Sequence, residues 1–132
     1  NYDVEDNAFA ILRNEKGVIT SIHSTATQWQ HKFNMEITCS KGAIVLDGIL
    51  SGTKTYGKET LKILPGAKPY LYKNNKKTKT YSFNKDTSWN DEVKEFAEMI
   101  LKNKKVKYGS ISDAIKVMIM IDKIYKNDII KK

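Results

Sequence analysis

The chain has 132 residues, of which 40% are hydrophobic and 29% are charged. Its length suits one compact domain with a core of its own, and its hydrophobic content excludes a disordered chain. The charged content excludes a membrane protein. In addition, no apolar run approaches the roughly 18 residues that a spanning helix needs.

The N-terminus is polar and acidic, and it has neither an initiator Met nor the features of a signal peptide. We therefore expect a chain that is cut from a longer protein. The single Cys39 cannot form a disulfide within the chain, which favours a reducing compartment and a cytoplasmic protein.

The net charge of +8 comes almost entirely from lysine, since Arg13 is the only arginine among 23 basic residues. Guanine edges and phosphates are read mainly by arginine, so a lysine surplus is a weak sign of nucleic-acid binding. A nucleic-acid binder that uses Lys73, Lys76, Lys77 and Lys79 is one hypothesis, which a salt-dependent gel shift would test. The simpler interpretation is a solvated lysine-rich surface, and we expect neither a nucleic-acid nor a membrane partner.

Residues 7 to about 84 have the pattern of β-strands. An apolar run at 8–12, a Gly-bearing turn at 15–17 and a second strand from 18 to about 27 are typical of a hairpin. Further strands are expected at 33–39, 43–46 and 61–63, with weaker ones at 70–72 and 81–83.

The strand at 33–39 alternates cleanly between two faces. We expect its apolar face, with Phe33, Met35 and Ile37, to lie under helices, and Cys39 on that face to be a small core residue. The other face would show a set of polar side chains, completed by one of two sets from the neighbouring strand. These residues are Asn34, Glu36 and Thr38, together with either Ser21, His23 and Thr25 or Thr20, Ile22 and Ser24. Short polar side chains suit either solvent or a second sheet, and we take the set with Ser21, His23 and Thr25 as the candidate oligomer interface.

Residues 88–103 and 111–127 are expected to form two helices. Ser88 and Asp91 resemble a capping box, and either Ser110 or Ser112 is expected to cap the second helix. Apolar residues fall on one face of the first helix and cover much of the second. Strands followed by helices predict a single α+β domain over residues 1–132, with a mostly antiparallel, open-faced sheet covered on one face by the two C-terminal helices.

Few residues have the spacing of a catalytic or metal site. Residues 51–55 (Ser-Gly-Thr-Lys-Thr) share a Gly and a Lys with phosphate-binding loops, but the glycine spacing is missing and a surface hairpin is favoured. His23, His31 and Cys39 are eight residues apart, which is not a compact metal-ligand spacing. We expect no metal site and no catalytic residue in this chain.

Trp29 and His31 stand where the second strand turns toward the third, flanked by glutamines. An indole and an imidazole at such a turn suit a polar ligand by stacking and hydrogen bonding. The alternative is a Trp packed on the sheet edge and a His in solvent. For Trp89, at the start of a helix, the residues themselves favour a core position.

The order of these pieces resembles the C-terminal domain of the Gfo/Idh/MocA family of NAD(P)-dependent oxidoreductases. The resemblance covers residues 3 to 126 and rests on an ordered series. Its members are the run Asp6 to Arg13, then Trp29, Phe33, Glu36-Ile37, Gly42, Asp47-Gly48, Tyr56-Gly57-Lys58-Glu59, Trp89-x-x-Glu92-x-x-x-Phe96, Ser112-Asp113-Ala114 and Ile124-Tyr125.

The resemblance implies a substrate-binding and oligomerisation domain of an enzyme that acts on a sugar, an inositol or a sugar derivative. NAD or NADP would be bound by an N-terminal Rossmann domain, and this chain would bind no cofactor and be inactive alone. The open sheet face would form a homodimer or homotetramer. The turn with Trp29 and His31, and the helix start at Trp89, would lie at the substrate cleft. The alternative is a non-catalytic binding or scaffold domain without a redox partner, which the upstream reading frame would distinguish.

Overall fold

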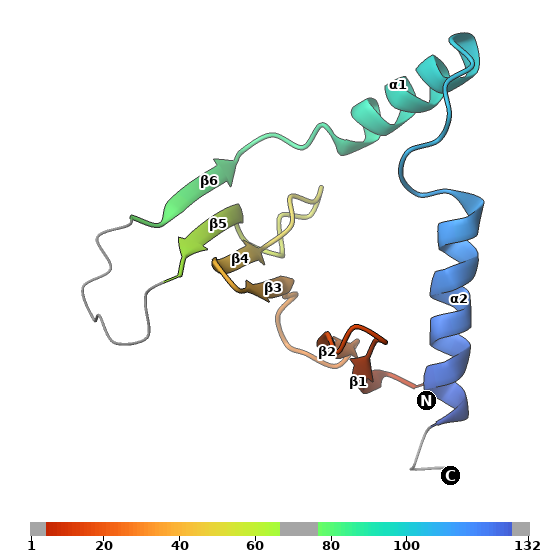
Figure 1. The fold of residues 1–132 in the computed structure, drawn as a ribbon. Coiled ribbons are helices and arrows are strands. Elements are labelled where there is room, and N and C mark those ends of the chain that lie inside the picture. Colours follow the sequence, from red (N-terminus) through yellow and green to blue (C-terminus); the bar gives the residue numbers. More distant parts are fainter. Residues whose placement is uncertain (1–4, 67–76, 128–132) are drawn as a thin grey trace. The chain divides into compact units, whose positions relative to one another are not determined.

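The computed structural model describes residues 5–66 and 77–127, which form six strands followed by two helices (Figure 1). The elements are β1 (Asn7–Arg13), β2 (Ile19–Thr25), β3 (Asn34–Cys39), β4 (Gly42–Asp47), β5 (Glu59–Pro65), β6 (Lys79–Phe83), α1 (Ser88–Leu101) and α2 (Ile111–Lys126). All strand pairs are antiparallel, so the fold is α+β with two C-terminal helices, as predicted. The strand predicted at 70–72 lies outside the described residues.

The described strands form two sheets where the sequence predicted one. β1 pairs with β2, and β3 to β6 pair in sequential order. The second strand was predicted to run to Thr27 but ends at Thr25. One more backbone bond follows, from the Ala26 N–H to the Asp6 carbonyl at 2.7 Å, and side-chain bonds then hold Thr27. The Thr27 N–H donates to Thr25 Oγ1 at 3.1 Å, and Asn7 Nδ2 donates to Thr27 Oγ1 at 2.8 Å. No strand forms again before Asn34, and β2 and β3 do not pair.

The chain groups into two compact units, which are described here separately. The first unit contains residues up to 27 and from 90 onward, and therefore β1, β2, most of α1 and α2. The second unit contains residues 28–89 and therefore the four-stranded sheet. The single domain expected from the sequence stays a prediction.

The four-stranded sheet has one apolar and one polar face. Residues opposite each other in an antiparallel pair point to the same side, so the register assigns each position to a face. The apolar face carries Met35, Ile37, Ile44, Leu46, Leu61, Ile63 and Tyr81, and the polar face includes Asn34, Glu36, Thr38, Asp47, Thr60, Lys62, Thr80 and Ser82. The alternation predicted for 33–39 is confirmed.

Cys39 is exposed, and its prediction as a core residue was wrong. It is the last residue of β3 and pairs with Gly42 at the tight turn into β4. A side chain at the end of a two-strand turn has few neighbours to cover it.

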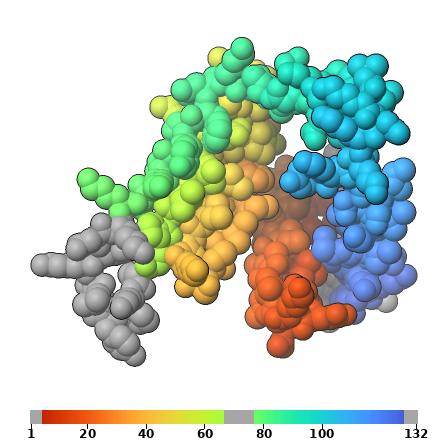
Figure 2. Space-filling view, turned by 45° about the horizontal axis from the view of Figure 1, so that its top comes forward, coloured from red at the N-terminus to blue at the C-terminus, as the bar shows by residue number. Residues whose placement is uncertain are grey.

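In the first unit, the hairpin β1–β2 lies beside the C-terminal half of α2 (Figure 2). The side of the hairpin with Ala8, Ala10, Leu12 and Ile22 is half-buried, and so are two isoleucines of α2. These two are Ile121 and Ile124. A groove of about 900 Å³ is lined by both elements.

Both helices begin with identifiable side-chain bonds. Ser110 caps α2: its Oγ accepts from the Asp113 N–H at 3.2 Å, and Asp113 Oδ2 accepts from the Ser110 N–H at 3.3 Å. This reciprocal pair is a capping box, and it decides between the two predicted caps. At the start of α1, the Asp86 carboxylate accepts from the N–H and the hydroxyl of Ser88 at 3.0 and 2.6 Å.

Among the described residues no hydrophobic side chain is fully buried. Neither α1 nor α2, within the part of the chain that the structure describes, is long and apolar enough to cross a membrane.

Candidate functional site

The side chain of His31 is held against the loop that joins β4 to β5. Its Nδ1 lies 2.8 Å from Thr55 Oγ1, and its ring centroid lies 4.9 Å from that of Tyr56 with the planes inclined at 55°. Thr55 is 24 residues from His31 in sequence. The imidazole therefore has a fixed orientation although its surface is exposed to solvent.

The β4–β5 loop, residues 48–58, is anchored at both ends. The Gly48 N–H donates to the Phe33 carbonyl at 3.0 Å, which ties the start of the loop to the segment that carries His31. At the other end, Glu59 Oε2 accepts from the Leu50 N–H at 2.8 Å in a partly buried bond. These two bonds place the middle of the loop next to His31.

Hydroxyl groups form a continuous chain through this loop to the imidazole. Ser51 Oγ lies 3.1 Å from Thr53 Oγ1, which lies 2.9 Å from Thr55 Oγ1, which reaches His31. We call these four side chains the hydroxyl–imidazole chain. Their alternation at every second residue places the three hydroxyls on one side of the loop.

Trp29 lies next to this chain, in the five-residue segment 28–32 that lines a surface pocket of about 360 Å³. The indole is fully exposed, with a relative accessibility of 102%. A fully exposed indole packs on no part of this unit. The alternative, a Trp packed on the sheet edge, therefore does not occur in the structure. The structure thus brings Trp29 and His31, both predicted from the sequence, to one pocket.

Trp89 is the second residue of α1 and is 76% exposed. It is not among the residues that line the Trp29 pocket. Its assignment to the substrate site stays a prediction.

The six predicted interface residues are divided between the two sheets. Asn34, Glu36 and Thr38 share the polar face of the four-stranded sheet, whereas Ser21, His23 and Thr25 share one face of the hairpin β1–β2. Because β2 and β3 are not paired, one continuous face of all six, as predicted, does not form within a sheet.

The imidazole of His23 stacks on Phe9, with ring centroids 4.0 Å apart and planes inclined at 12°. The two residues face each other directly across the hairpin. The alternative set, with Thr20, Ile22 and Ser24, shares the half-buried face with Ala10. The face with His23 is therefore the one that remains available to a partner.

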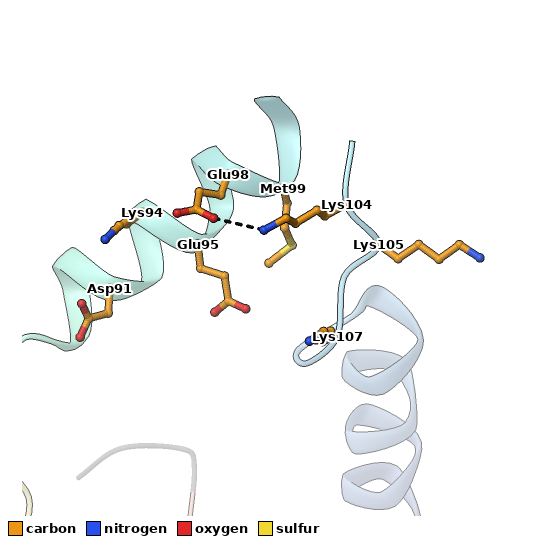
Figure 3. A pocket seen from close by; sticks show the side chains of 8 residues that line it. All are labelled: Asp91, Lys94, Glu95, Glu98, Met99, Lys104, Lys105 and Lys107. Atoms are coloured by element: carbon orange, nitrogen blue, oxygen red, sulfur yellow. Dashed lines mark hydrogen bonds and ion pairs between the residues drawn. The ribbon is translucent and has the colours of Figure 1, made fainter. Parts of the chain in front are cut away.

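A second pocket, of about 560 Å³, lies beside the C-terminal half of α1 and is lined by charged side chains (Figure 3). Glu98 Oε2 lies 3.1 Å from Lys102 Nζ and 3.3 Å from Lys104 Nζ, and Figure 3 shows Lys105 pointing away. Hydrogen bonds from Lys102, and then from Lys104, lower the pKa of the Glu98 carboxyl. The lysines neutralise the carboxylate at the helix end, so a solvated ion-pair cluster accounts for this pocket.

The described residues contain no group of three His, Cys, Asp or Glu side chains that could hold a metal ion. A Rossmann-type dinucleotide site has a Gly-rich turn between a strand and a helix. Within residues 5–66 and 77–127 the strand-to-helix connection is 84–87, and it contains no glycine. Of the lysines considered for nucleic acid, Lys73 and Lys76 lie outside the described residues.

Sequence reasoning missed the part that the β4–β5 loop has in the site. Residues 51–55 were interpreted as a surface hairpin, and they do form a surface loop, but Thr53 and Thr55 connect it to His31. The alternation of hydroxyl residues at 51, 53 and 55 was the signal available. The length of chain between Thr55 and His31 concealed their contact.

No protein-family model matches the chain, and no curated protein and no solved structure is found to match it.

Proposed function

We propose that the chain is the substrate-binding and oligomerisation domain of an NAD(P)-dependent oxidoreductase similar to the Gfo/Idh/MocA family. Its substrate would be a sugar, an inositol or a sugar derivative. The ordered residue series from Asp6 to Tyr125 supports this, as do antiparallel strands, in two sheets, followed by two helices. In this proposal the protein is cytoplasmic.

The observation that carries the proposal is the pairing of an exposed indole with an oriented imidazole. Trp29 presents its full ring surface to solvent beside His31, whose Nδ1 is bonded to Thr55 at 2.8 Å. The C–H face of a sugar ring packs on an indole, while imidazole and hydroxyl groups bond to its hydroxyls. A polyol matches this mixture of surfaces better than an apolar ligand does.

The chain's own residues would bind and orient the substrate in this scheme. NAD or NADP, held by an N-terminal Rossmann domain of the parent enzyme, would exchange a hydride with the substrate carbon. No catalytic residue is assigned to this chain, and the fragment alone is expected to be inactive. The partners are that Rossmann domain and further copies of the chain, in a homodimer or homotetramer through the polar sheet faces.

The test is a dehydrogenase assay on the protein as it is encoded, with NAD⁺ and NADP⁺ and a panel of sugars and inositols. Trp29→Ala and His31→Ala should raise KM or lower kcat, because both remove contacts to the substrate. Lys85→Ala, an exposed substitution in the same unit, is the control. Wild-type kinetics from both site variants would remove the site assignment.

A non-catalytic binding or scaffold domain is the alternative. In this alternative the chain binds a sugar. No protein that contains the chain then reduces NAD⁺ or NADP⁺. Calorimetric binding of a sugar, together with an absent dehydrogenase activity, would therefore favour the alternative over the proposal.

A further inference from the structure

The segment that carries Trp29 and His31, and the loop bonded to His31, contain basic residues and no acidic ones. Residues 26–33 and 48–58 include Lys32, Lys54 and Lys58 and neither Asp nor Glu. The carboxylate that follows, that of Glu59, is half-buried and accepts from the Leu50 N–H at 2.8 Å. The local field at this site is therefore positive, which favours a negatively charged ligand.

Lys54 has a backbone conformation that lysine rarely adopts. Its φ is +56°, in the left-handed region, where a residue with a Cβ is less stable than glycine by roughly 1 kcal/mol. It lies between Thr53 and Thr55, whose hydroxyls are bonded to each other at 2.9 Å. Glycine would relieve the backbone, so the lysine at this position indicates a use for its ammonium group.

The hydroxyl–imidazole chain always leaves a donor at one of its ends. If Nδ1 of neutral His31 accepts from Thr55, every hydroxyl proton lies within the chain and Nε2–H is the remaining donor. If Nδ1–H donates to Thr55, the direction reverses and the Ser51 hydroxyl has a free proton. A protonated imidazole gives donors at both ends. The donor end of the chain can bind a ligand group that only accepts hydrogen bonds, while a neutral imidazole leaves an acceptor at the other end.

From the charge, the position of Lys54 and the donors of the chain, we propose that the Trp29–His31 site binds a sugar that carries a carboxylate or a phosphate. This inference rests on the proposed function for the sugar part, and it adds the anionic group. A carboxylate and a phosphate both accept hydrogen bonds only, so the same donors can bind either group. The indole of Trp29 would pack on the sugar ring while Lys54 and the chain bind the anion.

The experiment measures binding to the 132-residue chain by isothermal titration calorimetry at constant ionic strength. The probes are glucose, myo-inositol, glucuronate, glucose 6-phosphate and inorganic phosphate. At least one anionic sugar should bind at least about tenfold more tightly than glucose, as one charge-assisted hydrogen bond implies. Whether glucuronate or glucose 6-phosphate binds more tightly identifies the anionic group.

Variants separate the two parts of the inference. Lys54→Gln should remove most of the preference for the anionic sugar, whereas Lys85→Gln, in the same unit but outside the loop, should leave it unchanged. Trp29→Ala should weaken all the sugars alike, because it removes the packing surface and not the charge.

Each of the remaining outcomes contradicts a specific part of the inference or of the proposed function. Equal binding of glucose and the anionic sugars would overturn the anionic preference and leave the proposed function standing. Inorganic phosphate that binds as tightly as glucose 6-phosphate would show a simple anion site and overturn the inference. Binding of none of the sugars or inositol would overturn the inference together with the proposed function.

Discussion

The turn at Gly48 offers a sharp test of how the β4–β5 loop is built. Gly48 is buried and has a φ of +72°. A Cβ at this position would lie 2.3 Å from the Lys58 carbonyl oxygen. Gly57 has a similar φ of +80°, but a Cβ there would meet nothing within 4 Å. Substitutions at the two glycines therefore separate the cost of a positive φ from the cost of a close contact between a new Cβ and the backbone.

Gly57→Ala should destabilise the chain by about 1 kcal/mol, the cost of a left-handed conformation for a residue with a Cβ. Gly48→Ala carries the same cost and must also displace the carbonyl of Lys58 by about 1 Å, since ordinary contacts of a Cβ lie beyond roughly 3.4 Å. This shift endangers the bond from the Gly48 N–H to Phe33, which is worth about 1 kcal/mol. We therefore expect a total of about 3 kcal/mol.

Urea unfolding followed by circular dichroism measures both variants, and a ¹H–¹⁵N spectrum reports on the loop. Gly48→Ala should also shift the resonances of His31 and Thr55, because the loop that places Thr55 moves. Gly57→Ala should leave them close to wild type. Equal destabilisation by the two substitutions would refute the close approach of Gly48 to Lys58.

Three further measurements test other parts of the fold. Ser110→Ala should lower stability by about 1 kcal/mol and reduce helical circular dichroism through loss of the capping box, whereas Ser112→Ala should not. Phe9→Ala should cost roughly 0.5 kcal/mol in urea unfolding by removing the stack on His23, and an unchanged midpoint would contradict that contact. Because its lysine partners lower the pKa of Glu98 in the folded state, its contribution to stability is present above its unfolded pKa and is lost as pH falls through the folded value. An NMR titration in which Glu98 keeps the pKa of a free glutamate would contradict the ion pairs.

The helices and the faces of the strands could be predicted from the sequence because they depend on local periodicity. The alternation at Met35 and Ile37 identified the apolar face of β3, and the serines at 110 and 112 placed the start of α2 to within two residues. Both signals lie within a few residues, so no knowledge of distant segments was needed.

The division into two sheets could not be predicted in this way. The patterns of β2 and β3 are compatible with pairing, and no local signal in the sequence distinguishes that arrangement from the two separate sheets that the structure has. Likewise, the bond between His31 and Thr55 joins residues 24 positions apart, and no local pattern specifies such a pair. Trp29 was predicted from its residue type and its place at a turn between two strands, and its full exposure came only from the structure.

The two units also differ in how their segments follow one another along the polypeptide. In the sheet β3–β4–β5–β6 every strand bonds to its neighbour in sequence, so this unit can assemble as soon as residues 28–89 have left the ribosome. The other unit joins the hairpin to a helix that follows the sheet in the sequence, so that the sheet is inserted between its two halves. Its closure must therefore wait until α2 has been made, and until then the hairpin is the segment that a chaperone or a protease would meet alone.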